Sequence, residues 1–288
     1  MSSTSPADDA AAFCANEVKQ HDFDRYAATL FMPPQQRRAL LALYAFNVEI
    51  VRVREQIRQP MAGEIRLQWW ADMLVGAGHG YVEGSPVAAE LMRAVETFAL
   101  PREPLSTLIE AHRFDLFNDP MPDLGALDVY VLETTSALFG LGARIAVAAP
   151  DLIAEAMRHA GLAYGYQRVL TMLPFDASRR QLYLPLSLLA AHGSSADEVF
   201  AGRPTAALRA AIRELAEKAL LHLQEMRTAL KALPPQARQV FLPAALAERR
   251  LRPMTAPDFN PFVPAPDTRL RVLWTLWRAS RSQDFRAR

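Results

Sequence analysis

Charged and polar side chains are mixed into an otherwise apolar helical pattern at residues 38–58, where they could either contact water or line a cavity. A carboxylate on a solvated helix is commonly paired with a basic residue four positions away. Glu49 has Val53 at that position. The apolar periodicity alone favours an amphipathic helix with these side chains on its solvent-exposed face. The unpaired charge of Glu49 indicates instead that some of them line a cavity. The polar side chains concerned are Asn47, Glu49, Arg52, Arg54, Glu55 and Arg58.

Other residue types that perform chemistry do not form recognisable motifs in this chain. Its single cysteine, Cys14, excludes an internal disulfide and a cysteine-based zinc site. The six histidines show no metal-ligand spacing with one another. Ser136 has no nucleophile context, and the glycine-rich segment 76–80 lacks the lysine of a phosphate-binding loop. We therefore interpret these residues as structural or surface residues.

The apolar periodicity indicates that helices position these side chains. Hydrophobic residues make up 51% of the 288 residues and the formal net charge is +1, so the chain can bury a core and shows no bias towards nucleic acid. No alternating run of β-branched and aromatic residues predicts a strand. We expect one all-α domain with helices near residues 7–21, 34–58, 63–76, 86–99, 103–117, 126–149, 151–173, 185–191, 204–232, 235–250 and 267–283.

The stretch 130–149 is apolar but rich in small residues, including Ser136, Gly140 and Gly142. Glycine inside a helix costs about 1 kcal/mol relative to alanine, so it usually has a packing reason. Small side chains would let either another helix or a ligand approach this stretch closely. The sequence does not decide between these two interpretations.

The two ends of the chain differ in charge. Residues 1–13 are polar and acidic without an apolar core, which argues against a secretory signal, and no charge-free apolar run of 18 residues predicts a membrane span. From Thr268 onwards the chain has six arginines and one acid, Asp284. An apolar stripe in this segment could lie on an anionic bilayer or form the last core helix, and we favour the core. Its members are Leu270, Leu273, Trp274 and Trp277.

Two short motifs stand out once the helices are placed. Tyr-Ala-Phe at 44–46 follows DFDRYAATLFMPPQQRRALLAL, and Arg-Gln-Leu-Tyr-Leu-Pro occupies 180–185. Both resemble motifs of the squalene/phytoene synthase superfamily, and the resemblance extends in collinear order from about residue 22 to 277. It implies a single-domain helical bundle of the isoprenoid synthase type at 22–283, between an N-terminal segment 1–21 and a tail 284–288.

In that superfamily, two clusters of acids hold Mg²⁺ against a prenyl diphosphate. The resemblance places the first cluster at Val51, Arg52 and Glu55, and the second at Met172 and Asp176. Mg²⁺ prefers hard oxygen ligands, and neighbouring arginines repel it. Only two of the five positions keep an acid, so we expect no catalytic residue, no metal and no cofactor. Mg²⁺ would be needed only if the protein were a working transferase.

The resemblance also indicates a remodelled cavity. Pro174 lies between the two positions of the second cluster, so we expect the helix to end or kink there. Glu55 and Asp176 would lie near arginines and form salt bridges with them. The candidate vestigial diphosphate site consists of Glu49, Arg52, Glu55, Arg168, Met172, Asp176, Arg179 and Tyr183. The candidate tunnel lining consists of Tyr44, Phe46, Thr135, Ser136 and Phe139.

These departures from the motifs resemble one branch of the superfamily, the respiratory complex I assembly factor 6 type and its bacterial relatives. That resemblance implies a non-catalytic cytoplasmic protein, peripheral on the inner face of the cytoplasmic membrane. Its expected partners are subunits or assembly intermediates of NADH:ubiquinone oxidoreductase. Two alternatives stay open: a head-to-head prenyl transferase that makes squalene or phytoene, and a carrier that binds a prenyl chain or quinone. No nucleic-acid partner is expected.

Overall fold

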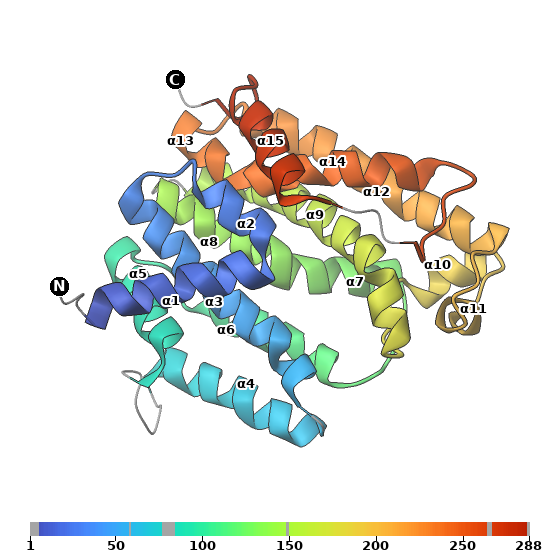
Figure 1. The fold of residues 1–288 in the computed structure, drawn as a ribbon, viewed down its shortest axis with the longest axis horizontal. Coiled ribbons are helices and arrows are strands. Elements are labelled where there is room, and N and C mark those ends of the chain that lie inside the picture. The colour runs from blue at the N-terminus through green and yellow to red at the C-terminus, as the bar shows by residue number, and fades with distance from the viewer. Residues whose placement is uncertain (1–5, 58, 77–83, 148–149, 264–266, 287–288) are drawn as a thin grey trace.

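Helix α3, Pro34–Gln56, lies at the centre of the molecule (Figure 1). It begins with proline, whose fixed backbone angle suits the first turn of a helix, and ends where Ile57 adopts an extended backbone. Every residue from 39 to 48 is buried, so this part of the helix needs neighbours on all sides. The helices that contact it include α1 (Pro6–His21), α4 (Pro60–Val75), α5 (Pro86–Phe98) and α8 (Ala137–Ala146).

The computed structural model describes residues 6–57, 59–76, 84–147, 150–263 and 267–286. These residues contain no β-strand, which confirms the all-α prediction. Arg58, residues 77–80 of the glycine-rich segment and the last two residues of the predicted tail lie outside the described residues. The remaining elements are α2 (Phe23–Thr29), α6 (Glu103–Ala111), η2 (His112–Leu116), α7 (Leu124–Val131), η3 (Leu132–Ser136), α9 (Pro150–Ser178), α10 (Leu186–Ala191), α11 (Ala196–Phe200), α12 (Ala206–Leu230), α13 (Pro235–Arg238), η4 (Gln239–Ala244), α14 (Ala245–Leu251), η5 (Arg252–Thr255) and α15 (Arg269–Ser280).

Helix α1 packs onto the bundle, although its residues were assigned to an N-terminal segment ahead of the domain. It contacts α3 and α5, and its Cys14 and Val18 side chains belong to the hydrophobic core. An ion pair between Arg38 on α3 and Glu90 on α5, with an N–O distance of 2.7 Å, joins these helices. In the predicted tail, Phe285 is also buried. Both ends of the chain therefore contribute to the core.

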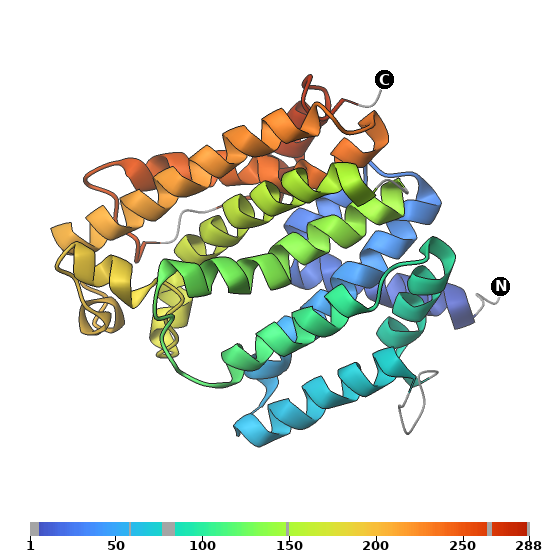
Figure 2. The ribbon, with the colours of Figure 1, turned by 180° about the vertical axis from the view of Figure 1, so that it is seen from behind.

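We expected the helix to end or kink at Pro174. Helix α9 continues through Pro174 to Ser178, so a helix end at residue 173 was wrong, while the kink stays a prediction. A proline inside a helix removes one backbone donor, which costs about 3 kcal/mol or more. Tertiary packing compensates here, because α9 packs extensively against α12 and also contacts α8 and η3 (Figure 2). Leu173 and Ala177, on either side of the proline, are both buried.

The predicted helix 126–149 is divided into α7, the π-helical segment η3 and α8. Ser136, at the end of η3, is fully buried against α9. A Cβ added at Gly161 of α9 would lie 1.8 Å from Ser136 Oγ and 2.5 Å from Ser136 Cα. The small residues here thus serve the close approach of two helices. By length and composition Leu124–Ala146 could cross a membrane. However, 50% of its most apolar 18-residue stretch is buried inside the bundle, as in a core helix.

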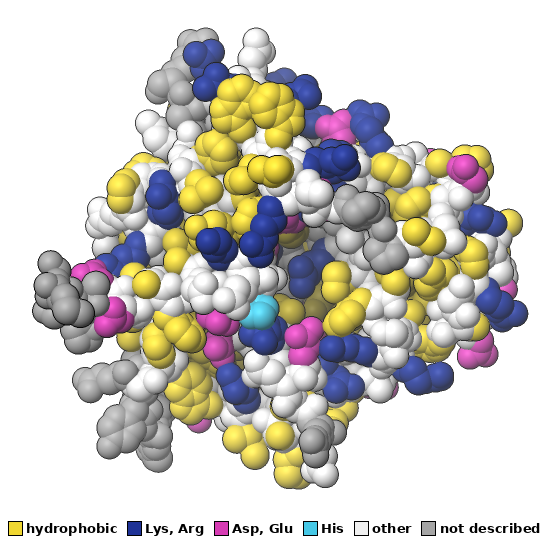
Figure 3. Space-filling view, viewed as in Figure 1, with side chains coloured by type: hydrophobic (Ala, Val, Ile, Leu, Met, Phe, Trp, Pro, Cys, Tyr) yellow, Lys and Arg dark blue, Asp and Glu magenta, His cyan; other side chains and the backbone are white. Residues whose placement is uncertain are grey.

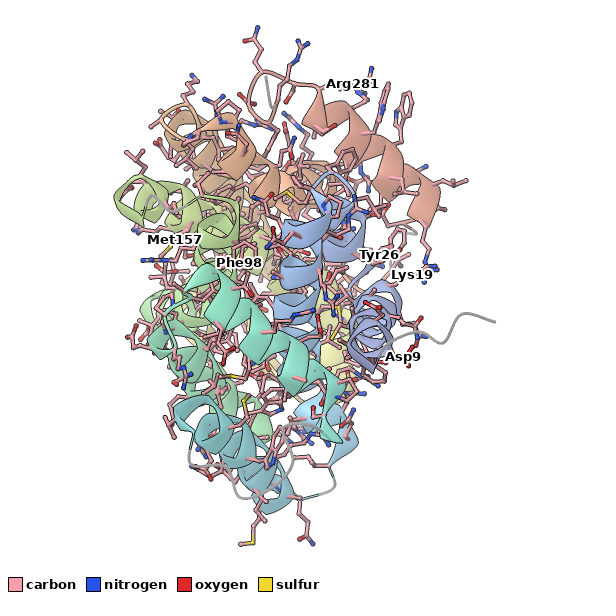
Figure 4. The ribbon with its side chains drawn as sticks, turned by 90° about the vertical axis from the view of Figure 1, so that its left-hand side faces the viewer. Asp9, Lys19, Tyr26, Phe98, Met157 and Arg281 are labelled. Carbon is pink, nitrogen blue, oxygen red and sulfur yellow. The ribbon has the colours of Figure 1, made fainter. Side chains whose placement is uncertain are left out.

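Helix α15 lies on the outside of the bundle, and Arg281 directly follows its last residue (Figure 4). Val272 and Leu276, four residues apart, are buried where α15 contacts α2 and α14. Leu270, Trp274 and Trp277 are exposed. Most of the stripe that we favoured as a core face therefore points to solvent, and that interpretation was wrong. The helix instead buries Val272 and Leu276.

We predict that Gly161→Ala destabilises the protein while Gly140→Ala does not. The new methyl group at 161 meets the backbone of Ser136, which cannot move away cheaply, and overpacking of this kind costs about 1–3 kcal/mol. At Gly140 the nearest atom is Met157 Sδ at 2.6 Å, near the end of a flexible side chain. Urea unfolding of both variants measures the difference. Equal stabilities would show that η3 and α9 are not closely packed.

Candidate functional site

A cavity of about 130 Å³ lies between α3 and α9, with η2, η3 and the segment after α9 completing its wall. Figure 3 shows a hollow between α3 and α9, with basic and acidic side chains at its rim. The structure therefore brings together side chains that are far apart in the sequence. The predicted site residues on its wall are Glu55, Arg168, Met172, Asp176, Arg179 and Tyr183, together with Thr135 from the predicted tunnel.

The carboxylate of Asp115 is the centre of a buried hydrogen-bond network on this wall. Tyr183 Oη donates to Asp115 Oδ1 at 2.7 Å, and Tyr130 Oη donates to the same oxygen at 2.9 Å. His112 Nδ1 lies 2.6 Å from Asp115 Oδ2. Gln181 Nε2 also donates to the backbone oxygen of Asp115 at 2.9 Å. One acid thereby connects η2, α7 and the segment after α9.

The network fixes the protonation of its donors. Burial, and next the negative charge of Asp115, raise the pKa of Tyr130 and of Tyr183 well above the ordinary tyrosine value, so both hydroxyls keep their protons. A neutral His112 would carry its proton on Nδ1, where the carboxylate accepts it. Its Nε2 is then a buried acceptor without a hydrogen-bond partner among the described residues. The network therefore supplies three side-chain donors to the Asp115 carboxylate and leaves this nitrogen facing no donor in the described structure.

Asp176 faces the same cavity in a different electrostatic state. Its carboxylate forms no hydrogen bond or ion pair with another side chain in the described part of the structure. Burial raises its pKa from 3.8 to about 7, because the charged form loses water that no donor replaces. Arg168 and Arg179 lower the pKa, and Asp115 and Glu55 raise it. The acid therefore keeps its proton to a higher pH than an exposed aspartate does.

Glu55 and Arg179 form an ion pair at the mouth of the cavity, with an N–O distance of 3.6 Å. Arg52 Nε lies 3.8 Å from Glu55 Oε2, and Arg52 Nη1 lies 3.5 Å from Glu17 Oε2 of α1. All these side chains are partly exposed, so each pair contributes at most about 1 kcal/mol. The expected pairing of Glu55 with arginines is present, but it is a solvated network and not a buried one.

Glu49 and Arg52 do not line the cavity, unlike the other residues of the predicted diphosphate site. Glu49 Oε2 instead accepts a hydrogen bond of 2.6 Å from Arg66 Nη2 on α4. Its basic partner therefore comes from a neighbouring helix, which a search at the fourth residue along α3 could not reveal. Arg52 points towards α1 and pairs with Glu17.

Thr135 lines the cavity, but the other predicted tunnel residues do not. The ring of Phe46 packs edge-on against Trp70, with centroids 5.0 Å apart. The ring of Phe139 stacks on Phe241 at 5.5 Å. Aromatic pairs of this kind fill space between helices that a tunnel would need. The predicted tunnel residues that are packed into the core are Tyr44, Phe46, Ser136 and Phe139.

The residues on this wall do not fit a magnesium cluster. Val51 and Met172 line the cavity at two of the positions where the motif resemblance places metal-binding acids. Across the described ranges, no group of three or more His, Cys, Asp or Glu side chains is placed to hold a metal ion. Arg168 and Arg179 add positive charge to the same wall. Mg²⁺ needs several hard oxygen ligands close together, and the acids of this wall are not grouped in that way in the described ranges.

The sequence motifs did not predict the Asp115 network as part of the site. The available signal was local: His112 and Asp115 are three residues apart, so they share one face of a helical turn. Tyr130 and Tyr183 come from two other segments, and their contact with Asp115 depends on the tertiary fold. Arg25 was missed as well, although it lines the cavity from α2.

We predict that Asp115→Ala is far more destabilising than Glu55→Ala. Removing Asp115 leaves three buried donors without an acceptor, and each unsatisfied group costs about 1–3 kcal/mol. Removing Glu55 breaks two partly exposed ion pairs, each worth at most about 1 kcal/mol. Chemical denaturation of the two variants at one pH measures this. Similar losses would mean that Asp115 is not the centre of the network.

A second prediction concerns the pH dependence of stability. Between about pH 4 and 7 the folded protein keeps a proton on Asp176 that the unfolded chain has released, so this group stabilises the fold at low pH and the effect is lost as the pH rises towards 7. Asp176→Asn cannot ionise. Its free energy of unfolding should therefore exceed that of the wild type by more at pH 8 than at pH 4.

The control for this experiment is Glu217→Gln, which changes an exposed acid on α12. Denaturant titrations at both pH values compare the two variants with the wild type. A difference between Asp176→Asn and the wild type that does not change with pH would contradict the raised pKa.

The chain matches the family model for squalene/phytoene synthase over residues 18–278. It is 28% identical over 254 residues to the human NADH dehydrogenase (ubiquinone) complex I assembly factor 6, an alignment that covers 88% of this chain and 76% of the relative. It is also 30% identical over 199 residues to presqualene diphosphate synthase of Rhodopseudomonas palustris, covering 68% of this chain and 70% of that one.

The fold is also that of solved prenyl-synthase structures. A dehydrosqualene synthase in complex with a ligand superposes with a TM-score of 0.84 at 16% sequence identity, covering 96% of this chain and 98% of that chain. At this identity the similarity shows the fold alone. The family model, in contrast, covers nearly the whole bundle, from α1 to α15. The chain therefore belongs to the squalene/phytoene synthase family, and its fold is that of the isoprenoid synthases.

Proposed function

We propose that the protein is a non-catalytic member of this family that assists the assembly of NADH:ubiquinone oxidoreductase at the inner face of the cytoplasmic membrane. The observation that carries the proposal is the composition of the cavity wall. Val51 and Met172 stand where metal-binding acids are expected, and Arg168 and Arg179 stand beside the remaining Asp176. Similarity to complex I assembly factor 6 along 88% of the chain supplies the specific role.

The charge of the cavity argues against ionisation of an allylic diphosphate. That reaction needs strong stabilisation of the departing pyrophosphate, which Mg²⁺ ordinarily provides. Burial raises the pKa of Asp176 and Glu55 is paired with Arg179, so these two acids offer a divalent ion less negative charge than a full cluster of acids would. Arg168 and Arg179 could stabilise part of the departing charge, but they replace only part of the positive charge that Mg²⁺ ions would supply.

The size of the cavity points in the same direction. A volume of about 130 Å³ is below the roughly 300–1,000 Å³ of pockets that enclose drug-sized ligands. Two of the predicted tunnel residues, Phe46 and Phe139, have rings packed against Trp70 and Phe241. A carrier that holds a prenyl chain or a quinone would need these rings to move. The rigid, packed bundle is better suited to present its outer surface to subunits or assembly intermediates of the complex.

The proposal predicts two results for the wild-type protein. Purified protein with Mg²⁺ and farnesyl or geranylgeranyl diphosphate should release no pyrophosphate above background. Deletion of the gene should reduce fully assembled NADH:ubiquinone oxidoreductase on native gels, and complementation should restore it, while the polyprenyl products of the cell stay unchanged. The matched control for complementation is a variant altered on an exposed part of α12, Glu217→Gln.

The rival functions give different outcomes in the same experiments. Magnesium-dependent pyrophosphate release with a squalene or phytoene product would establish a prenyl transferase. A purified protein that retains a stoichiometric quinone or polyprenol, extracted with solvent and identified by mass, would establish a carrier. Normal levels of the assembled complex in the deletion strain would contradict the assembly role directly.

A further inference from the structure

Helix α15 exposes its most apolar side chains to solvent. Leu270 is 79% exposed, Trp274 is 59% exposed and Trp277 is 38% exposed. The same helix buries Val272 and Leu276 on its opposite side, so the exposed residues are not needed for its attachment to the bundle. We call Leu270, Trp274 and Trp277 the α15 outer face. In Figure 3 a hydrophobic patch lies over α15, with basic side chains on both sides of it.

The two tryptophans of this face are arranged side by side. Their rings stack with centroids 4.9 Å apart and planes inclined by 21°, so they form one continuous flat apolar surface. The guanidinium of Arg281 lies 4.3 Å from the centroid of the Trp277 ring. Tryptophan combines an apolar body with one polar N–H group, a combination that suits the boundary between water and lipid.

Arginines surround the outer face, and none of them is neutralised within the described structure. Arg271, Arg278 and Arg281 are exposed, and Arg269 lies over the ring of Phe23 at 4.8 Å. Helix α15 contains no acid. The nearby Arg249 is different, because it pairs with Asp267 at 2.6 Å. A surface that leaves its positive charges unpaired beside apolar side chains is complementary to an anionic partner.

The shape and charge of this face favour one kind of partner. A second copy of the chain, docked by a two-fold axis on the same face, would place these arginines against one another. A hollow beside this face is lined by Trp274 and Arg278 together with Glu248 and Asp284, whose carboxylates pair with Arg227. Leu270 is not part of that lining, so a partner seated in the hollow would not cover the whole outer face. Helix α15 itself lies on the outside of the bundle (Figure 4). An anionic bilayer is flat, accepts indole rings at its headgroup level and offers phosphates to the arginines.

We propose that the α15 outer face binds the surface of an anionic phospholipid bilayer, with the tryptophans at the headgroup level and the arginines on lipid phosphates. The inference rests on the geometry of α15. It specifies the surface that would hold the protein at the membrane location of the proposed function. The assembly role and vesicle binding are measured separately, so either can fail while the other holds.

The test is co-sedimentation of the full-length protein with vesicles of phosphatidylcholine, either alone or mixed with phosphatidylglycerol. We expect binding to the mixed vesicles only, and weaker binding at high salt. Trp274→Gln with Trp277→Gln, and separately Arg271→Glu with Arg278→Glu, should each lower the partition coefficient about tenfold or more. The matched control is Met61→Gln with Ile65→Gln, which removes two exposed apolar side chains of α4 and should not change binding.

Bromine-labelled lipids add a readout that does not depend on affinity alone. Quenching of tryptophan fluorescence in the wild type, and its loss in the variant with both α15 tryptophans replaced, would place these rings in the bilayer. Absence of binding to anionic vesicles at low salt would overturn the proposal. So would equal losses in the α4 control, since binding would then not be specific to α15.

Two further outcomes would assign the α15 outer face to another partner and so refute the bilayer. A wild-type dimer in light scattering that becomes monomeric in Trp274→Gln would mean that a second copy covers it. Full vesicle binding by both α15 variants, with loss of assembled complex in cells carrying them, would mean that a protein subunit covers it. Complementation measured beside vesicle binding therefore separates failure of this inference from failure of the assembly role.

Discussion

The arrangement of the cavity depends on one buried carboxylate. Asp115 accepts hydrogen bonds from Tyr130 and Tyr183 and contacts His112, and these residues come from three separate segments. Without this acid, two tyrosine hydroxyls and an imidazole would be buried unpaired, so the segments that carry them could not meet at this point. The network also positions Gln181 and, next to it, the chain that follows α9. It thereby fixes the place of Arg179 at the cavity mouth.

Asp115 and Asp176 line the same cavity, yet their environments have opposite effects. Asp115 is surrounded by donors that replace its lost water. Asp176 lacks such donors, and burial raises its pKa to about 7. The difference follows from the local elements. Asp176 lies on α9 beside Met172 and Phe175, which bring apolar surface to the wall, whereas Asp115 faces the aromatic hydroxyls of α7 and of the segment after α9. The two acids of this cavity thus have different environments, one with hydrogen-bond donors and one with apolar neighbours.

Local pattern predicted much of the fold from the sequence. The periodicity of residues 34–58 placed α3 within a few residues, because nearly every apolar position of this helix is buried. The short helix α2 was missed, since seven residues are too few to show a helical period. The end predicted at Pro174 was wrong because the rule describes an isolated helix, and contacts with α12 hold α9 together. Local rules fail where tertiary contacts decide.

The candidate site was less predictable than the fold. Motif positions led to Glu55, Met172 and Asp176, and all three line the cavity. Spacing along one helix could not reveal that Glu49 pairs with Arg66 on α4, or that Tyr130 and Tyr183 converge on Asp115. Those contacts join residues separated by many positions in the chain. A sequence shows which groups are available, and the packing of helices determines which of them meet.

The charges at the cavity mouth reduce the repulsion between the acids that face the cavity. Several carboxylates facing one cavity repel one another unless a metal ion neutralises them, so such a site is stable chiefly when loaded. In this chain Val51 and Met172 remove two of those charges, and Arg179 balances Glu55. The remaining acid, Asp176, has its pKa raised by burial, so this wall disfavours a further negative charge. With few carboxylates on the wall and with Arg168 and Arg179 beside them, less repulsion opposes the packing of α3 against α9 across the cavity.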